Sequence, residues 1–99
     1  MTNINFKNKT VVITGGSKGI GLEITKTFLK HQANVIILAR NKPKQKIQSK
    51  GNTGYFIECD IRNAESIDSA IKDIASKYKS IDVLINNAGG APMADSLTA

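Results

Sequence analysis

Residues Val11–Gly21 read Val-Val-Ile-Thr-Gly-Gly-Ser-Lys-Gly-Ile-Gly, and the rest of the chain is organised around them. Three β-branched apolar residues run into a cluster of glycines, and apolar side chains then recur at helical spacing at Ile20, Ile24 and Phe28. The pattern predicts a buried strand, a sharp turn and an amphipathic helix. We expect Gly15 to permit the turn, because glycine adopts backbone angles that other residues avoid.

The turn between this strand and helix has the properties of an anion-binding site. The first amides of a helix have no partner within the helix, and the helix dipole places partial positive charge beside them. The spacing excludes a P-loop, because Leu22 and Glu23 follow Gly21 where that motif needs Lys and then Ser or Thr. The motif is Thr-Gly-x-x-x-Gly-x-Gly, starting at Thr14, and it also differs from Gly-x-Gly-x-x-Gly. It indicates a nucleotide-phosphate site, with a plain tight turn as the alternative.

Length and composition place narrow limits on the rest. The chain has 99 residues, of which 40% are hydrophobic and 22% charged, which is ordinary for a globular protein but short for a complete nucleotide-binding sheet. Cys59 is the single cysteine, so no internal disulfide forms, which fits a cytoplasmic location. We expect no metal site, because His31 and Cys59 are the only soft ligands, and no segment is long enough to span a membrane.

Much of the net charge of +6 lies between Arg40 and Lys50. This basic segment favours either a nucleic-acid surface or a solvated loop beside an anionic ligand. No aromatic residue alternates with its lysines to stack on bases, so nucleic-acid binding is the weaker interpretation.

Strand and helix patterns alternate along the chain. Asn63 is a suitable N-cap for one helix, and Pro43 limits another to a short segment. The predicted strands are Thr10–Thr14, Asn34–Ala39, Tyr55–Cys59 and Asp82–Ile85, and the predicted helices run from Gly19 to about Lys30, from about Lys44, and from Ala64 to about Tyr78. This alternation predicts an α/β fold with right-handed crossovers. We expect a truncated Rossmann-type parallel sheet with strand order 3-2-1-4 and helices on both faces.

Polar residues follow each of the four predicted strands. They are Thr14 to Gly21, Arg40, Asp60, and Asn86 to Gly89. In such sheets ligands bind beyond the carboxyl ends of the strands, at the point where the strand order reverses. The four strand ends therefore predict one shared binding crevice.

With these motifs, the sequence resembles the short-chain dehydrogenases/reductases. Thr14–Gly21 matches the cofactor loop of that family, Asn86-Asn87-Ala88-Gly89 matches its Asn-Asn-Ala-Gly motif, and Asp60-Ile61 matches its acidic-apolar pair. The resemblance extends from about Lys9 to Gly90. Residues 1–99 are then the N-terminal part of a single NAD(P)-binding domain, with a core of about 9–90 and an unassigned tail over 91–99.

The resemblance also implies where a dinucleotide lies. The loop holds the pyrophosphate, Asp60 and Ile61 lie against the adenine, and the Asn-Asn-Ala-Gly motif lies along the adenosine ribose. The expected cofactor-binding residues are Thr14, Gly15, Ser17, Lys18, Gly19, Ile20, Gly21, Arg40, Asp60, Ile61, Asn87, Ala88 and Gly89. For Asp60 a helix-side cap or an ion pair with Arg62 is the alternative, and the asparagines are alternatively turn formers.

Arg40 indicates which dinucleotide is preferred. It lies 19 positions after Gly21, where NAD-binding sites usually carry an acidic residue that accepts from the ribose 2′-hydroxyl. A guanidinium there favours a 2′-phosphate, and Lys18 in the loop is a second cation for the same group. We therefore expect NADP(H) to be preferred over NAD(H), with a solvated charge as the alternative for Arg40.

The chain departs from the family in one respect that concerns chemistry. The resemblance implies a catalytic Ser and a Tyr-x-x-x-Lys motif beyond the Asn-Asn-Ala-Gly stretch. Neither tyrosine of this chain has the lysine of that motif four residues later: Cys59 stands there after Tyr55, and Asp82 after Tyr78. We expect no catalytic residue in this chain. In the complete protein we expect hydride transfer between the nicotinamide and a small carbonyl or alcohol substrate, and a homo-oligomer. A non-catalytic nucleotide-binding or sensing module is the alternative.

Overall fold

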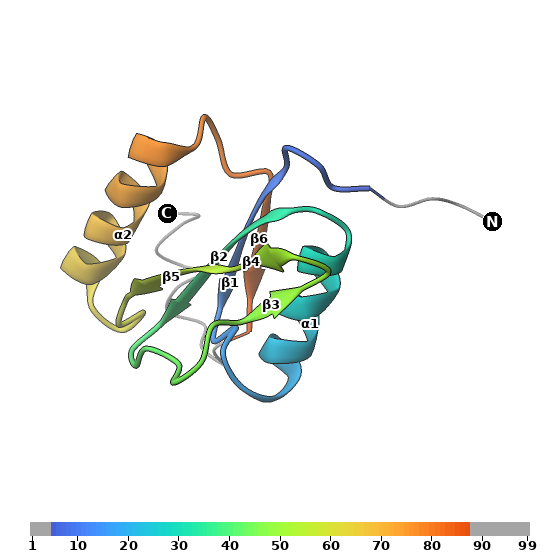
Figure 1. Cartoon of the computed structure of the whole chain (residues 1–99). Coiled ribbons are helices and arrows are strands. Elements are labelled where there is room, and N and C mark those ends of the chain that lie inside the picture. The colour runs from blue at the N-terminus through green and yellow to red at the C-terminus, as the bar shows by residue number, and fades with distance from the viewer. Residues whose placement is uncertain (1–4, 88–99) are drawn as a thin grey trace.

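The computed structural model describes residues 5–87 and shows a four-stranded parallel sheet with one helix on each face (Figure 1). The elements are β1 Thr10–Thr14, α1 Gly19–Lys30, β2 Asn34–Ala39, β3 Gln48–Ser49, β4 Asn52–Thr53, β5 Tyr55–Glu58, α2 Ala64–Lys77 and β6 Val83–Asn86. The strand order of the large sheet is β5-β2-β1-β6, and every pair in it is parallel. This confirms the predicted 3-2-1-4 order, because β5 and β6 are the third and fourth strands of the prediction.

The two faces of the sheet bury two separate apolar clusters. Val12 on β1 belongs to the cluster with Ile67 and Ile74 of α2. Ile13, the next residue but on the opposite face, belongs to the cluster with Leu29 of α1. All five residues of β1 are buried, as expected of a central parallel strand that is covered on both sides.

Each helix meets the sheet through residues spaced four or three apart. In α1 the buried residues are Gly21, Thr25 and Leu29, and in α2 they are Ile67, Ala70 and Ile74. The predicted N-cap of α2 is confirmed, because the side chain of Asn63 accepts a hydrogen bond from the amide of Ser66 at 3.1 Å.

The prediction of a short helix from about Lys44 is wrong. A two-stranded antiparallel hairpin, β3–β4, begins within the last residues of the basic segment, and its turn residues Lys50 and Gly51 have φ angles of 53° and 79°. Two consecutive residues with positive φ form the kind of tight turn that matches the twist of a hairpin. Ile47, just before β3, is buried in the apolar cluster that contains Leu29 of α1. Burial of this side chain, and not local helix propensity, therefore determines the conformation of the segment.

Strand β6 forms one edge of the described sheet. It pairs with β1, from Val11 opposite Val83 to Thr14 opposite Asn86. Leu84 on this strand is 40% exposed, so this edge is only partly covered by residues 5–87. Neither helix of the described region has the length and apolar character needed to cross a membrane.

Candidate functional site

The predicted site residues within the described region lie after the carboxyl ends of the four parallel strands. The loop from Gly15 follows β1, Arg40 follows β2, Asp60 follows β5 and Asn87 follows β6. Because all four strands are parallel, these ends share one edge of the sheet. Ala88 and Gly89, also predicted for the site, lie outside the described residues.

The loop after β1 opens onto an uncapped helix. Gly15 donates its amide to the carbonyl of Leu38 at 2.8 Å and then turns with a φ of 66°, as predicted for this glycine. Helix α1 begins at Gly19, and its N-cap residue, Lys18, makes no side-chain hydrogen bond to the first turn. The first turn holds no acidic residue, in contrast to α2 with its Asn63 cap and Glu65. The start of α1 is therefore free to face an anion.

Gly21 lets the first turn of α1 pack closely on the loop. A Cβ at this position would collide with the carbonyl of Gly15 and with the side chain of Asn87. Only glycine fits at this close approach of the helix to the loop.

Thr14 and Asn87 connect the loop to the end of β6. The Thr14 hydroxyl lies 3.0 Å from Oδ1 of Asn86 and accepts the amide of Asn87 at 2.9 Å. The side-chain amide of Asn87 donates to the carbonyl of Gly15 at 3.3 Å. These contacts fix two neighbouring strand ends relative to each other, which is a larger role for Thr14 than closing its own turn.

Asp60 is held by Arg62, as one of the alternatives for it stated. Its Oδ1 accepts from the backbone amide of Arg62 at 3.0 Å and from Nε of the same residue at 3.2 Å. The Arg62 side chain, and then its backbone amide, hold the pKa of Asp60 below its ordinary value, and the charge of Arg40 acts in the same direction. The carboxylate is thus ionised and oriented, and its Oδ2 makes the longer contact, 3.4 Å, with Arg62.

The other predicted site residues differ in exposure. Lys18 and Arg40 are exposed, and Ile20 is 74% exposed, which is unusual for a large apolar side chain. Ser17 is half-buried. Ile61 packs against the α2-side cluster, so part of its side chain already serves the core.

Two polar residues were missed from the sequence, Thr25 at this edge of the sheet and Asn52 at the opposite end, where β2 begins. Thr25 lies on the buried stripe of α1 and donates to the carbonyl of Gly16 in the loop, and Asn52 donates to carbonyls at the end of α1. A threonine at an apolar position of a helical pattern is the one signal that could have drawn attention to Thr25. Residues 5–87 contain no group of His, Cys, Asp and Glu that could hold a metal ion.

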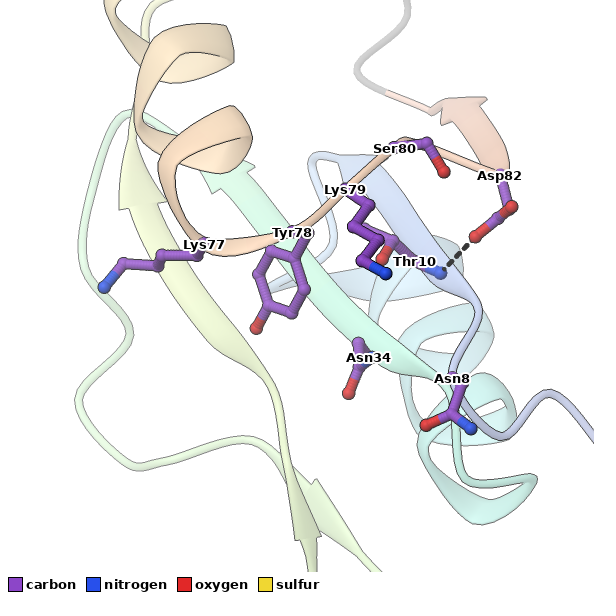
Figure 2. Close-up of a pocket in the computed structure, with 8 residues that line it drawn as sticks. All are labelled: Asn8, Thr10, Asn34, Lys77, Tyr78, Lys79, Ser80 and Asp82. Carbon is purple, nitrogen blue, oxygen red and sulfur yellow. Dashed lines mark hydrogen bonds between the residues drawn. The ribbon is translucent and has the colours of Figure 1, made fainter.

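A small open pocket lies at the opposite end of the sheet (Figure 2). It has a volume of about 200 Å³ and is lined by Asn8, Thr10, Asn34, Lys77, Tyr78, Lys79, Ser80 and Asp82. Asp82 accepts the amide of Thr10 at 2.8 Å and returns its own amide to the carbonyl of Thr10, which aligns β6 with β1. These contacts give this end a structural role.

Comparison with known proteins identifies the family to which this sequence belongs. The sequence profile of the short chain dehydrogenases matches residues 9–98. This chain belongs to the short-chain dehydrogenase family. A fatty acyl-CoA reductase of Mycobacterium tuberculosis is 36% identical over 105 residues, which cover 98% of this chain and 36% of the relative. The 7alpha-hydroxysteroid dehydrogenase of Escherichia coli is 37% identical, with 94% of this chain and 41% of the relative covered.

The fold is shared with solved structures of the same kind. The crystal structure of an NADH-dependent reductase complexed with NAD superposes with a TM-score of 0.76 and 26% identity, covering 90% of this chain and 39% of that one. The chain therefore spans about two fifths of the length of each of these three proteins.

Proposed function

We propose that residues 1–99 form the N-terminal, dinucleotide-binding part of an NADP(H)-dependent oxidoreductase. The observation that carries the proposal is the uncapped first turn of α1, which opens at the same sheet edge as Arg40, Asp60 and Asn87. Membership of the short-chain dehydrogenase family supports a nicotinamide dinucleotide as the ligand.

The residues present fit such a cofactor. Gly21 lets the first turn of α1 approach the carbonyl of Gly15, which brings the start of the helix close to the loop. In this proposal the amides from Ser17 to Gly21 hold the pyrophosphate, because the first turn of α1 has no side-chain cap. Asp60 and Ile61 would bind the adenine, and Asn87, Ala88 and Gly89 would lie along its ribose. Ile20 offers an exposed apolar surface for a ring of the cofactor.

Arg40 and Lys18 support the preference for NADP(H). Both are exposed cations in segments that follow the carboxyl ends of β1 and β2, and Arg40 is close enough to influence the pKa of Asp60. A guanidinium binds a phosphate through charge-assisted, often bidentate, hydrogen bonds. The solved reductase that is complexed with NAD shows that this fold also serves the cofactor without the 2′-phosphate, so the choice depends on such side chains.

The chemical step that we propose is hydride transfer with a small carbonyl or alcohol substrate. The bound nicotinamide supplies or accepts the hydride, and this chain holds and orients the adenosine and pyrophosphate. Neither Tyr55 nor Tyr78 has a lysine four residues later, so we assign proton transfer to residues outside 1–99. We also propose that the complete protein is a cytoplasmic homo-oligomer.

Replacement of Arg40 tests the cofactor preference. Arg40→Asp should reverse the order of affinity for NADPH and NADH, because it removes a charge-assisted contact and adds repulsion, together about 2–3 kcal/mol. The measurement is the dissociation constant of each cofactor by titration calorimetry at fixed salt. Lys44→Asp, an exposed residue of the same basic segment, is the matched control and should lower both affinities slightly and equally. Equal affinity of the unchanged protein for NADPH and NADH would contradict the preference.

A further inference from the structure

Thr25 is a polar residue in a place where an apolar one would suffice. It lies on the buried stripe of α1 between Gly21 and Leu29 and is completely buried. Its hydroxyl donates to the carbonyl of Gly16 in the loop at 3.0 Å. A valine has nearly the same shape, so the hydroxyl itself is the feature that needs an explanation.

The same helix contains a threonine that shows the ordinary alternative. Thr27 is exposed and donates back to the carbonyl of Glu23, four residues earlier, at 2.9 Å. This is the usual way in which a threonine satisfies itself within a helix. Thr25 instead uses its proton on a backbone group nine residues away, outside the helix.

Gly16 is shaped to receive this contact. A Cβ on Gly16 would lie 2.6 Å from the Thr25 hydroxyl oxygen and 3.2 Å from Cγ2 of Ile13. Gly16 and Thr25 therefore form a matched pair, with the small residue in the loop and the hydroxyl in the helix.

The contact has a consequence for the neighbouring amide. A peptide unit is planar and trans, so its carbonyl and its N–H point in opposite directions. Because Thr25 holds the carbonyl of Gly16, the amide of Ser17 in the same peptide unit points away from Thr25. Ser17 precedes the N-cap of α1, where the unpartnered amides of the first turn begin.

We propose that Thr25 is a positioning residue of the phosphate-binding loop: its hydroxyl fixes the Gly16–Ser17 peptide unit and thereby presents the Ser17 amide to the pyrophosphate of the cofactor. This inference rests on the proposed function and deepens it. It predicts that Thr25 affects phosphate binding at this loop and leaves binding of the adenosine end unchanged.

The test compares two probes on variants of Thr25. ADP carries the pyrophosphate, whereas 2′-AMP carries only the adenosine and the 2′-phosphate. In Thr25→Val the dissociation constant for ADP should rise about five- to tenfold, the effect of one hydrogen bond of about 1–1.4 kcal/mol, and that for 2′-AMP should stay the same. Thr25→Ser should retain the affinity for ADP. By NMR, ADP should shift the Ser17 amide resonance in the parent and shift it less in Thr25→Val.

A double variant keeps the inference testable if Thr25→Val folds poorly. Gly16→Ala alone should destabilise the protein because of the short contact with Thr25, and Gly16→Ala with Thr25→Ala should recover that stability but still bind ADP weakly. A parent that binds neither probe would contradict the proposed function, and this inference with it. Unchanged ADP affinity in Thr25→Val, or an equal loss for ADP and 2′-AMP, would overturn the inference alone.

Discussion

At the scale of single residues, polar side chains at the carboxyl edge of the sheet mainly hold backbone groups. The Thr14 hydroxyl accepts the amide of Asn87, the Thr25 hydroxyl holds the carbonyl of Gly16, and the Asn87 side chain holds the carbonyl of Gly15. Three side chains therefore hold backbone groups of the loop and of the end of β6 in place. Such preorganisation lowers the conformational entropy that binding would otherwise cost.

Asp60 is the residue whose role most needs a direct test. If its carboxylate accepts from the adenine amino group, Asp60→Ala should weaken NADPH and NADH by the same factor, because both cofactors carry the same adenine. Calorimetric titration of both cofactors measures this. Glu58→Ala removes another exposed carboxylate two residues earlier and should leave both affinities unchanged. If the variant lost thermal stability but bound both cofactors as before, the role of Asp60 would be limited to its ion pair with Arg62.

The sequence predicts some of these residues and not others, for a physical reason. Gly15 and Asn63 act within a few residues of their own position, so local patterns indicate them. The Asp60–Arg62 contact is also local, and the sequence left it as an alternative. The partner of Thr25 is set by how α1 packs on the loop, and no spacing in the sequence encodes that packing.

At the scale of elements, the β3–β4 hairpin shows where local patterns fail. Its strands have two residues each, so there is no periodicity to detect, whereas the longer apolar strands β1 and β2 begin and end at the predicted residues. The hairpin is instead held by contacts with other elements, because the side-chain amide of Asn52 donates to the carbonyls of Ala33 at 2.8 Å and Leu29 at 3.3 Å. It thereby ties the hairpin to the last turn of α1 and to the residue just before β2; the carbonyl of Leu29 also accepts from the amide of Gln32 at 3.0 Å.

This contact predicts the effect of one substitution on stability. Asn52→Ala should lower the free energy of unfolding by about 1–2 kcal/mol, because it removes the side-chain amide that donates to two carbonyls in a part-buried position. Urea denaturation followed by circular dichroism measures the loss. Thr53→Ala, the exposed neighbour on β4, should change the stability by less. An equal effect of both substitutions would show that Asn52 does not anchor the hairpin.

At the scale of the whole molecule, the two ends of the sheet differ in character. One end has the open start of α1 and the glycines of the loop, and the other has the small pocket in which Asp82 aligns β6 with β1 (Figure 2). The order of strands and helices predicted this polarity, because parallel strands place all their carboxyl ends together. We propose that the dinucleotide binds at the first of these ends.

The most direct test is to map NADPH binding by backbone amide NMR on the isotopically labelled protein. If NADPH binds at the carboxyl ends of the strands, one group of amide resonances shifts with a single dissociation constant: those of Gly15, Ser17 to Gly21, Arg40, Asp60 and Asn87. The resonances of Asn8, Thr10, Asn34 and Lys79, at the opposite end, stay in place. Shifts confined to the pocket at the opposite end of the sheet, or to the lysines of the basic segment, would contradict this proposal.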